Sequence, residues 1–221
     1  MAKKILLFII ILAFVGCTNK VDKLFNKAQI LEQNGKYLEA INILDKVIEL
    51  KPDFLGAYIN RGADYAELGM YKKAIENYKQ VIKLDPKNQL ALFNIANNYQ
   101  YKFNDYYEAI KYYDKALMFK KLNKLSIKIN NTDIQIQQFE IPENQIYFER
   151  GNAFYNIKQF ENALFDFKLS FKEQQDNPES TYMIGASLHM LGRKNEACIE
   201  FKKAKNLGFE LAKSEYKINC E

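Results

Sequence analysis

The segment GKYLEA at residues 35–40 returns as GMYKKA at residues 69–74, 34 positions further along the chain. Pro52 and Pro86 are separated by the same 34 positions. Because independent pairs of residues share one offset, we infer that the chain is built from a repeat of 34 residues. Repeats of this length stack so that each unit packs mainly against its neighbours.

Each unit has the apolar spacing of two helices joined by a tight turn. In the second unit, Gly62 and Ala74 are small residues at the expected crossing of the two helices, where larger side chains would push the backbones apart. Gly69 supplies the turn between them. Asp85-Pro86 ends the second helix, because proline cannot continue the hydrogen-bond ladder.

At these positions the chain resembles the tetratricopeptide repeat family. The matching residues, repeat by repeat, are Ala28, Leu31, Ala40, Leu44, Val47 and Pro52; Gly62, Tyr65, Ala74, Tyr78, Val81 and Pro86; Ala96, Tyr99, Ala109, Tyr113 and Ala116; Gly151, Phe154, Ala163, Phe167 and Ser170; and Gly185, Leu188, Ala197, Phe201 and Ala204. The resemblance covers most of residues 21–208. It implies an all-α fold, a right-handed superhelical solenoid of about five helix-turn-helix repeats.

The spacing between repeats three and four is longer than the others. Twenty extra residues lie within 122–143, where apolar residues alternate with polar ones on either side of Asn130-Asn131-Thr132-Asp133. We expect a short β-hairpin insertion there, with a disordered linker as the alternative. Repeats one to three would then occupy residues 17–121 and repeats four and five residues 144–208. A capping helix over residues 209–221 would cover the last apolar face.

The first residues have the pattern of an export signal. Lys3 and Lys4 precede an apolar run from Ile5 to Val15, which is too short to span a bilayer. The sequence Phe14-Val15-Gly16-Cys17 resembles the end of a bacterial lipoprotein signal, although the family usually has Leu where Phe14 stands. The resemblance implies a signal peptide over residues 1–16 and a lipid on Cys17. The protein would then be anchored to a membrane of the bacterial cell envelope, facing the periplasm.

Two further cysteines remain once Cys17 is assigned to the lipid. Cys198 lies at the start of one expected helix and Cys220 at the end of the next. Because an antiparallel pair brings these two ends together, we predict a Cys198–Cys220 disulfide, with two buried free thiols as the alternative.

The composition argues against several classes of function. The net charge is only +5 and the basic residues are spread along the chain, which disfavours a nucleic-acid binder. His189 is the only histidine, so a site with several histidine ligands is excluded. No Gly-rich phosphate loop or nucleophile motif is present. We therefore expect neither catalysis nor a cofactor or metal, although a pair of catalytic carboxylates stays open.

The remaining candidate is a surface. In the family, the first helices of successive repeats line a concave groove that binds peptide. Carried over by position, the groove residues are Phe25, Phe93, Asn97, Tyr101, Phe148, Asn152, Tyr155, Asn156, Tyr182 and His189. Aromatic rings bury partner side chains and Asn amides pair with peptide backbone, whereas the alternative for each aromatic is a place in the core.

We therefore expect a scaffold that binds a protein or an extended peptide. The family's lysine clamp for a carboxyl terminus is absent, because aromatic or aliphatic residues stand at its positions. A glycan- or peptidoglycan-associated accessory protein is the alternative, since aromatic rings also stack on sugars, and a hydrolase with an unrecognised carboxylate pair is a third. The sequence does not specify an oligomeric state.

Overall fold

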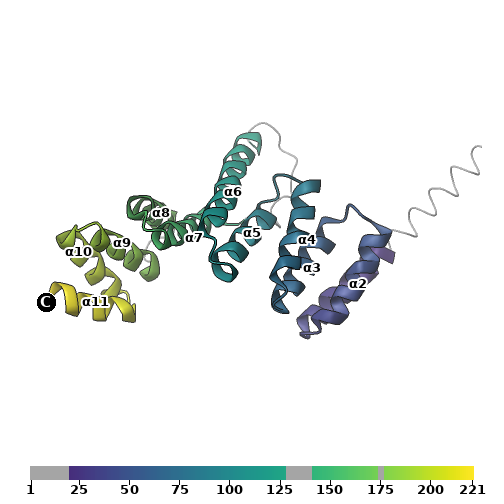
Figure 1. Cartoon of the computed structure of the whole chain (residues 1–221), viewed down its shortest axis with the longest axis horizontal. Coiled ribbons are helices and arrows are strands. Elements are labelled where there is room, and N and C mark those ends of the chain that lie inside the picture. Colours follow the sequence, from purple (N-terminus) through teal and green to yellow (C-terminus); the bar gives the residue numbers. More distant parts are fainter. Residues whose placement is uncertain (1–19, 128–140, 174–176) are drawn as a thin grey trace, which may run out of the picture. The chain divides into compact units, whose positions relative to one another are not determined.

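The computed structural model describes residues 20–127, 141–173 and 177–221 (Figure 1). Every regular element in these ranges is a helix and none is a strand, which agrees with the expected all-α class. The chain divides into two compact units, with the boundary between Pro86 and Lys87.

The described part of the first unit, residues 20–86, contains four helices. Residues 20–33 are helical, and α2 (Tyr37–Leu50), α3 (Leu55–Glu67) and α4 (Tyr71–Leu84) follow. Helix α3 packs against both α2 and α4. The unit is therefore two consecutive helical pairs, the arrangement expected for repeats one and two.

In its described residues, the second unit continues the same pattern with three further pairs and a final helix. Its elements are α5 (Gln89–Lys102), α6 (Tyr106–Ile127), α7 (Glu143–Asn156), α8 (Phe160–Glu173), α9 (Pro178–Met190), α10 (Lys194–Asn206) and α11 (Glu210–Cys220). Consecutive helices pack in chain order from α5 to α11, and Figure 1 shows α9, α10 and α11 lying together. Helix α11 buries Ala212 and partly buries Tyr216, as expected for a cap.

A glycine and an aromatic ring meet where the two helices of a pair cross. A Cβ added at each of these glycines would lie 2.7 or 2.8 Å from the ring, closer than real side chains approach. The pairs are Gly62 with Tyr78, Gly151 with Phe167 and Gly185 with Phe201. Repeat one carries Ala28 in place of the glycine and the smaller Leu44 in place of the aromatic residue, and both are fully buried. The repeat pattern therefore encodes the spacing between two helix backbones.

The prediction of a β-hairpin is wrong for the part of residues 122–143 that the structure describes. Residues 122–127, including Leu125 and Ile127, belong to α6 rather than to a strand. No Gly or Pro interrupts the chain between Tyr106 and Ile127, and Lys and Leu dominate residues 119–125, so the helix continues past the expected boundary. Residues 128–140, which hold the rest of the predicted insertion, lie outside the described residues.

Candidate functional site

The first helices of neighbouring repeats are joined by polar contacts in both units. In the first unit, the Asn60 amide on α3 donates hydrogen bonds of 3.0 and 3.2 Å to the two oxygens of the Glu32 carboxylate. In the second unit, the Tyr101 hydroxyl on α5 donates to Glu149 on α7. Each unit therefore has a face made of first helices, which we call its first-helix face.

Glu149 is the centre of a polar cluster on the first-helix face of the second unit. Besides Tyr101, the Gln100 amide lies 3.5 Å from the same Glu149 oxygen, and Asn152 also hydrogen-bonds to the carboxylate. Burial raises the pKa of the Glu149 carboxyl, while the hydrogen bonds from Tyr101 and Asn152 oppose the shift. Tyr101 itself is 53% exposed, so this network holds an aromatic ring in place at the surface.

Gln100 contributes an unusual acceptor to this cluster. Its side chain is only 2% exposed, yet its Oε1 has no hydrogen-bond partner among the residues that the structure describes. A buried carbonyl oxygen without a partner is costly, and most such groups in folded proteins are satisfied. The cluster therefore contains one unpaired acceptor that the fold itself closes off from solvent.

Two tyrosines continue the face beyond this cluster. Burial raises the pKa of both Tyr155 on α7 and Tyr182 on α9, and the charge of Glu215 on α11 raises each pKa further. The Tyr155 ring packs edge-on against Phe160, and the Tyr182 ring lies 5.0 Å from Phe209 between centroids. Both rings are partly buried, so part of each supports the fold and part remains accessible.

Some aromatics predicted to line the groove belong to the core instead. Phe93 is 4% exposed and packs against Tyr113, so its assignment to the groove is wrong. Phe148 is half-buried against Phe167. These rings occupy the helix crossing, because the small residue opposite leaves room for two rings there.

Phe25 in the first unit also packs partly against the core. Its ring lies edge-on to Phe54 at 5.0 Å and contacts the position where Gly56 would carry a Cβ. The ring is partly buried against the cluster that contains Ala28 and Leu44. It therefore helps to seat the start of α3 on the preceding repeat.

The predicted amides and the histidine are placed differently from one another. Asn97 accepts a 2.5 Å hydrogen bond from the buried Tyr113 hydroxyl, which fixes its side chain. The exposed Asn156 donates to the Asn152 carbonyl of its own helix at 2.8 Å. His189 is exposed near the end of α9, with its ring 6.5 Å from that of Phe201.

The first unit has an acidic first-helix face. Asp64 on α3 is 2% exposed, and its Oδ2 has no hydrogen-bond partner within the described part of the chain. Burial, with the negative charges of Glu32 and Glu67, raises the pKa of Asp64 to about 7. Burial also raises the pKa of Glu32. We call Glu32, Asp64 and Glu67 the acidic face.

An arginine beside the crossing glycine ties neighbouring repeats together. Arg150 on α7 binds Asp166 on α8 with two hydrogen bonds of 2.7 Å and Asp114 on α6 at 2.5 Å. Arg61 on α3 binds Asn77 on α4 at 2.8 Å and Asp45 on α2 at 2.5 Å. Each guanidinium thus connects the second helices of two successive repeats through a first helix.

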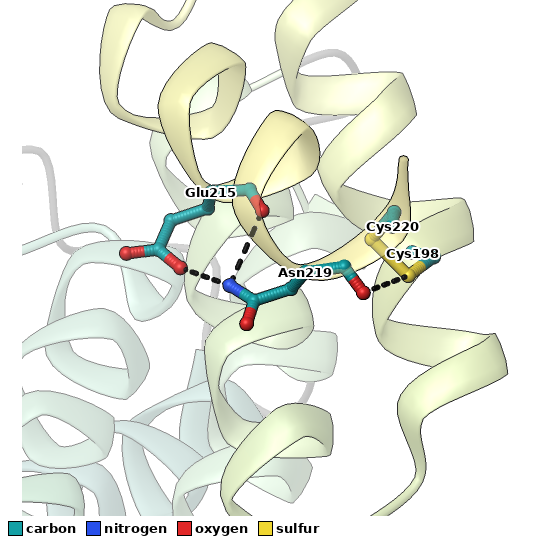
Figure 2. The surroundings of a disulfide bond; sticks show 4 residues. All are labelled: Cys198, Glu215, Asn219 and Cys220. Carbon is teal, nitrogen blue, oxygen red and sulfur yellow. Dashed lines mark hydrogen bonds between the residues drawn. A yellow bond between two sulfur atoms is a disulfide. The ribbon is translucent and has the colours of Figure 1, made fainter.

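Cys198 on α10 and Cys220 at the end of α11 form a disulfide, the two cysteines that the helix geometry was expected to bring together (Figure 2). Figure 2 also shows Asn219, whose amide donates to the Glu215 side chain at 2.7 Å and to the Glu215 carbonyl at 3.2 Å. The bond therefore attaches the capping helix covalently to the last repeat.

The charged residues that organise both faces were not predicted from the sequence. Asp64 and Glu149 were not identified, because acidic residues on a helix are ordinarily expected at the surface. The bridging arginines had a visible signal, since Arg61-Gly62 and Arg150-Gly151 repeat the same dipeptide at the same place in two repeats.

Cys17 and the expected signal peptide lie outside the described residues. None of the helices that the structure describes has the length and apolarity to cross a membrane. Likewise, the described ranges contain no cluster of three or more His, Cys, Asp or Glu side chains arranged to hold a metal ion.

Sequence comparison recognises two repeats. The tetratricopeptide repeat family matches residues 24–54 and 56–88. DnaJ homolog subfamily C member 3 of Gallus gallus is 24% identical over 94% of this chain and 41% of its own length. Hsp70-Hsp90 organizing protein 3 of Arabidopsis thaliana is 37% identical over 32% of this chain and 13% of its own length.

A third relative is an enzyme. The UDP-N-acetylglucosamine–peptide N-acetylglucosaminyltransferase of Giardia intestinalis is 34% identical over 33% of this chain, which is 5% of the enzyme. The chain thus spans less than half the length of each of these three relatives.

Solved structures share the helical arrangement. MamA from Desulfovibrio magneticus RS-1, solved from residue 41 to its end, superposes with a TM-score of 0.70 at 16% identity, covering 85% of this chain and 94% of the solved MamA chain. YrrB, described as a TPR protein with an unusual peptide-binding site, gives 0.67 at 18% identity, covering 91% of this chain and 97% of YrrB. The chain therefore contains tetratricopeptide repeats, recognised at residues 24–54 and 56–88, and its helices share the fold of solved proteins of this kind.

Proposed function

We propose that the protein is a non-enzymatic scaffold that binds an extended segment of a partner protein on its first-helix faces. The observation that carries the proposal is Tyr101, an aromatic ring that is 53% exposed and is still held by a hydrogen bond to the half-buried Glu149. An ordered exposed aromatic loses little further entropy on binding and buries a large apolar area.

The comparisons support this proposal in outline. YrrB, which shares the fold, is described as having a peptide-binding site. A segment of 71 residues is 37% identical to part of Hsp70-Hsp90 organizing protein 3, whose name describes a protein that organises other proteins. The positions of the family's lysine clamp hold Phe25, Ile59, Phe93, Phe148 and Tyr182 in this chain. A partner that ends in a clamped carboxylate is therefore not the one we propose.

Site-specific photo-crosslinking tests the proposal in cells. A photoreactive phenylalanine analogue at position 101 lies on the first-helix face of the second unit, whereas the same analogue at position 165 lies on the exposed side of α8. Phe165 is 62% exposed, so the two positions have similar access to solvent. We expect a defined protein adduct from position 101 and not from position 165.

Identical adducts from both positions would contradict a specific face. Mass spectrometry of the adduct also separates the proposal from the alternative, because a glycan-binding protein would crosslink to saccharide and co-sediment with purified peptidoglycan. A protein adduct together with no co-sedimentation supports the scaffold.

We also propose that the chain is exported and held at the cell envelope by a lipid on Cys17, facing the periplasm. The support is the sequence Phe14-Val15-Gly16-Cys17 after a short apolar run. The Cys198–Cys220 disulfide is in keeping with an oxidising compartment. Mass spectrometry of the mature amino terminus tests it. A diacylated Cys17 is expected, and an unmodified Cys17 or a retained Met1 would contradict it.

A further inference from the structure

The helix at residues 20–33 has one side in the core of the first unit and one side in solvent. Val21 and Ala28 are buried in that core. Three lysines are exposed along the other side, with the spacing of three and four residues that places side chains in a row on a helix. We call them the lysine stripe: Lys20, Lys23 and Lys27.

The charge of the lysine stripe is not offset by acidic side chains. Lys36 and Lys111 each form an ion pair with a glutamate three residues away, but no ion pair with a residue that the structure describes involves the stripe. Asp22 is the one acidic residue in the first three turns of the helix, and it lies about 100° around the helix axis from Lys23. The stripe is therefore an uncompensated row of positive charge.

An exposed aliphatic residue extends the row. Ile30 follows Lys23 by seven residues, which is about two helical turns, and its side chain is 58% exposed. On a helix that lies on a bilayer, lysines contact anionic headgroups while an aliphatic side chain enters the boundary of the acyl region. A membrane surface would therefore use both kinds of side chain, whereas a free anion would use only the lysines.

The proposed anchor lies next to the stripe in the sequence. Cys17 precedes Lys20 by three residues, and three residues of fully extended chain span at most about 11 Å. A lipid on Cys17 would therefore hold the start of the helix close to the headgroups. The attraction between a lysine and anionic lipid acts over a Debye length of about 8–10 Å, so it would reach Lys20 at once.

We propose that the lysine stripe binds a surface of anionic phospholipid, so that the helix at residues 20–33 lies along the membrane that carries the anchor. This inference rests on the lipid anchor of the proposed function and adds an orientation to it. Glu32 follows Lys23 by nine residues, which places it on about the opposite side of the helix. The first-helix face of the first unit, where Glu32 meets Asn60, would then point away from the membrane and stay open to a partner.

Chemical footprinting of lysines tests the proposal. The purified protein is reconstituted into vesicles of phosphatidylcholine, alone or with about one third phosphatidylglycerol, and is treated with an acetylating reagent. Mass spectrometry then gives the acetylation rate of each lysine. We expect the stripe to react about threefold or more slowly in the anionic vesicles, and high salt to abolish the difference. Lys72 and Lys79 on α4 are exposed internal controls whose rates should not change, because the exposed Glu76 lies between them.

Two double variants with the same change in charge sharpen the result, with Lys27 as the reporter in both. Lys20→Gln/Lys23→Gln removes two of the three charges of the stripe and should abolish the protection of Lys27. Lys72→Gln/Lys79→Gln removes two charges from α4 and should leave that protection unchanged. All four substituted lysines are exposed, so both variants should fold, which circular dichroism checks.

Equal acetylation of the stripe in neutral and anionic vesicles, or equal loss of Lys27 protection in the two double variants, would overturn the inference. Protection of the α4 lysines to the same extent as the stripe would also overturn it, because a general attraction of the protein's net charge would then explain the result. The anchor is decided separately by mass spectrometry of the mature amino terminus. A diacylated Cys17 with no protection of the stripe would leave the proposed function standing and remove only this inference.

Discussion

Arg150 donates two parallel hydrogen bonds of 2.7 Å to the carboxylate of Asp166, which is 1% exposed. Burial raises the pKa of Asp166, and the guanidinium opposes that shift. The same guanidinium also reaches Asp114 on α6. One side chain therefore neutralises a buried carboxylate and links three helices.

Removing this guanidinium should destabilise the second unit strongly. Arg150→Ala leaves Asp166 buried without a partner, and we expect a loss of about 3–5 kcal/mol in the free energy of unfolding. Arg61→Ala is the matched control, because Arg61 pairs with the neutral Asn77 and the more exposed Asp45, so its loss should be smaller. Urea unfolding followed by circular dichroism measures both, and equal losses would contradict the argument.

The glycine at a helix crossing should be replaceable by alanine only if the aromatic residue packed against it is also replaced by a smaller one. Gly151→Ala places a Cβ 2.8 Å from Phe167, and we expect it to cost about 1–3 kcal/mol through overpacking. Repeat one solves the same crossing with Ala28 and Leu44. The double variant Gly151→Ala/Phe167→Leu should therefore lose less stability than the sum of the two single variants. Strict additivity in a double-mutant cycle would show that the contact is unimportant.

Asp64 should make the stability of the first unit depend on pH. Its pKa in the folded protein is about 7, above its ordinary value of 3.8, so the folded state binds the proton more tightly than the unfolded state. The contribution of Asp64 to the free energy of unfolding is then most favourable below about pH 4 and is lost as the pH rises through about 7. Asp64→Asn should be more stable than wild type at pH 8, by roughly 1–3 kcal/mol, and similar to it at pH 4. Thermal scans at both pH values measure this, and a variant that is less stable at pH 8 would refute it.

The disulfide should contribute to the stability of the last repeat. Replacing both Cys198 and Cys220 with Ser opens a link between residues 22 apart, and we expect a loss of about 3 kcal/mol. A reducing agent should lower the melting temperature of wild type and not that of the double variant. Two free thiols in the oxidised, denatured protein would show that the bond does not form in solution.

The helical pairs were predictable from sequence because their determining contacts are close in the chain. Gly62 and Tyr78 are only 16 residues apart, so the spacing of small and aromatic residues reports the crossing directly. The β-hairpin was predicted wrongly because a few alternating apolar residues do not distinguish a strand from a helix that simply continues. There, α6 runs on to Ile127.

The candidate site was harder to predict for a different reason. Phe93 and Tyr101 both stand at positions expected to face the groove, yet one is core and the other exposed. The difference depends on how the next repeat packs, which periodicity does not encode. Asp64 and Glu149 were missed because a charged residue in a helix is assigned to solvent unless its neighbours in space are known.

The cross-link between α10 and α11 has a mechanical consequence. If the chain is stretched, tension that enters at Cys220 passes through the sulfur atoms to Cys198 and does not act on the residues between them. Helix α11 and the part of α10 after Cys198 would then carry no load, and the first rupture would have to begin at or before the first turn of α10.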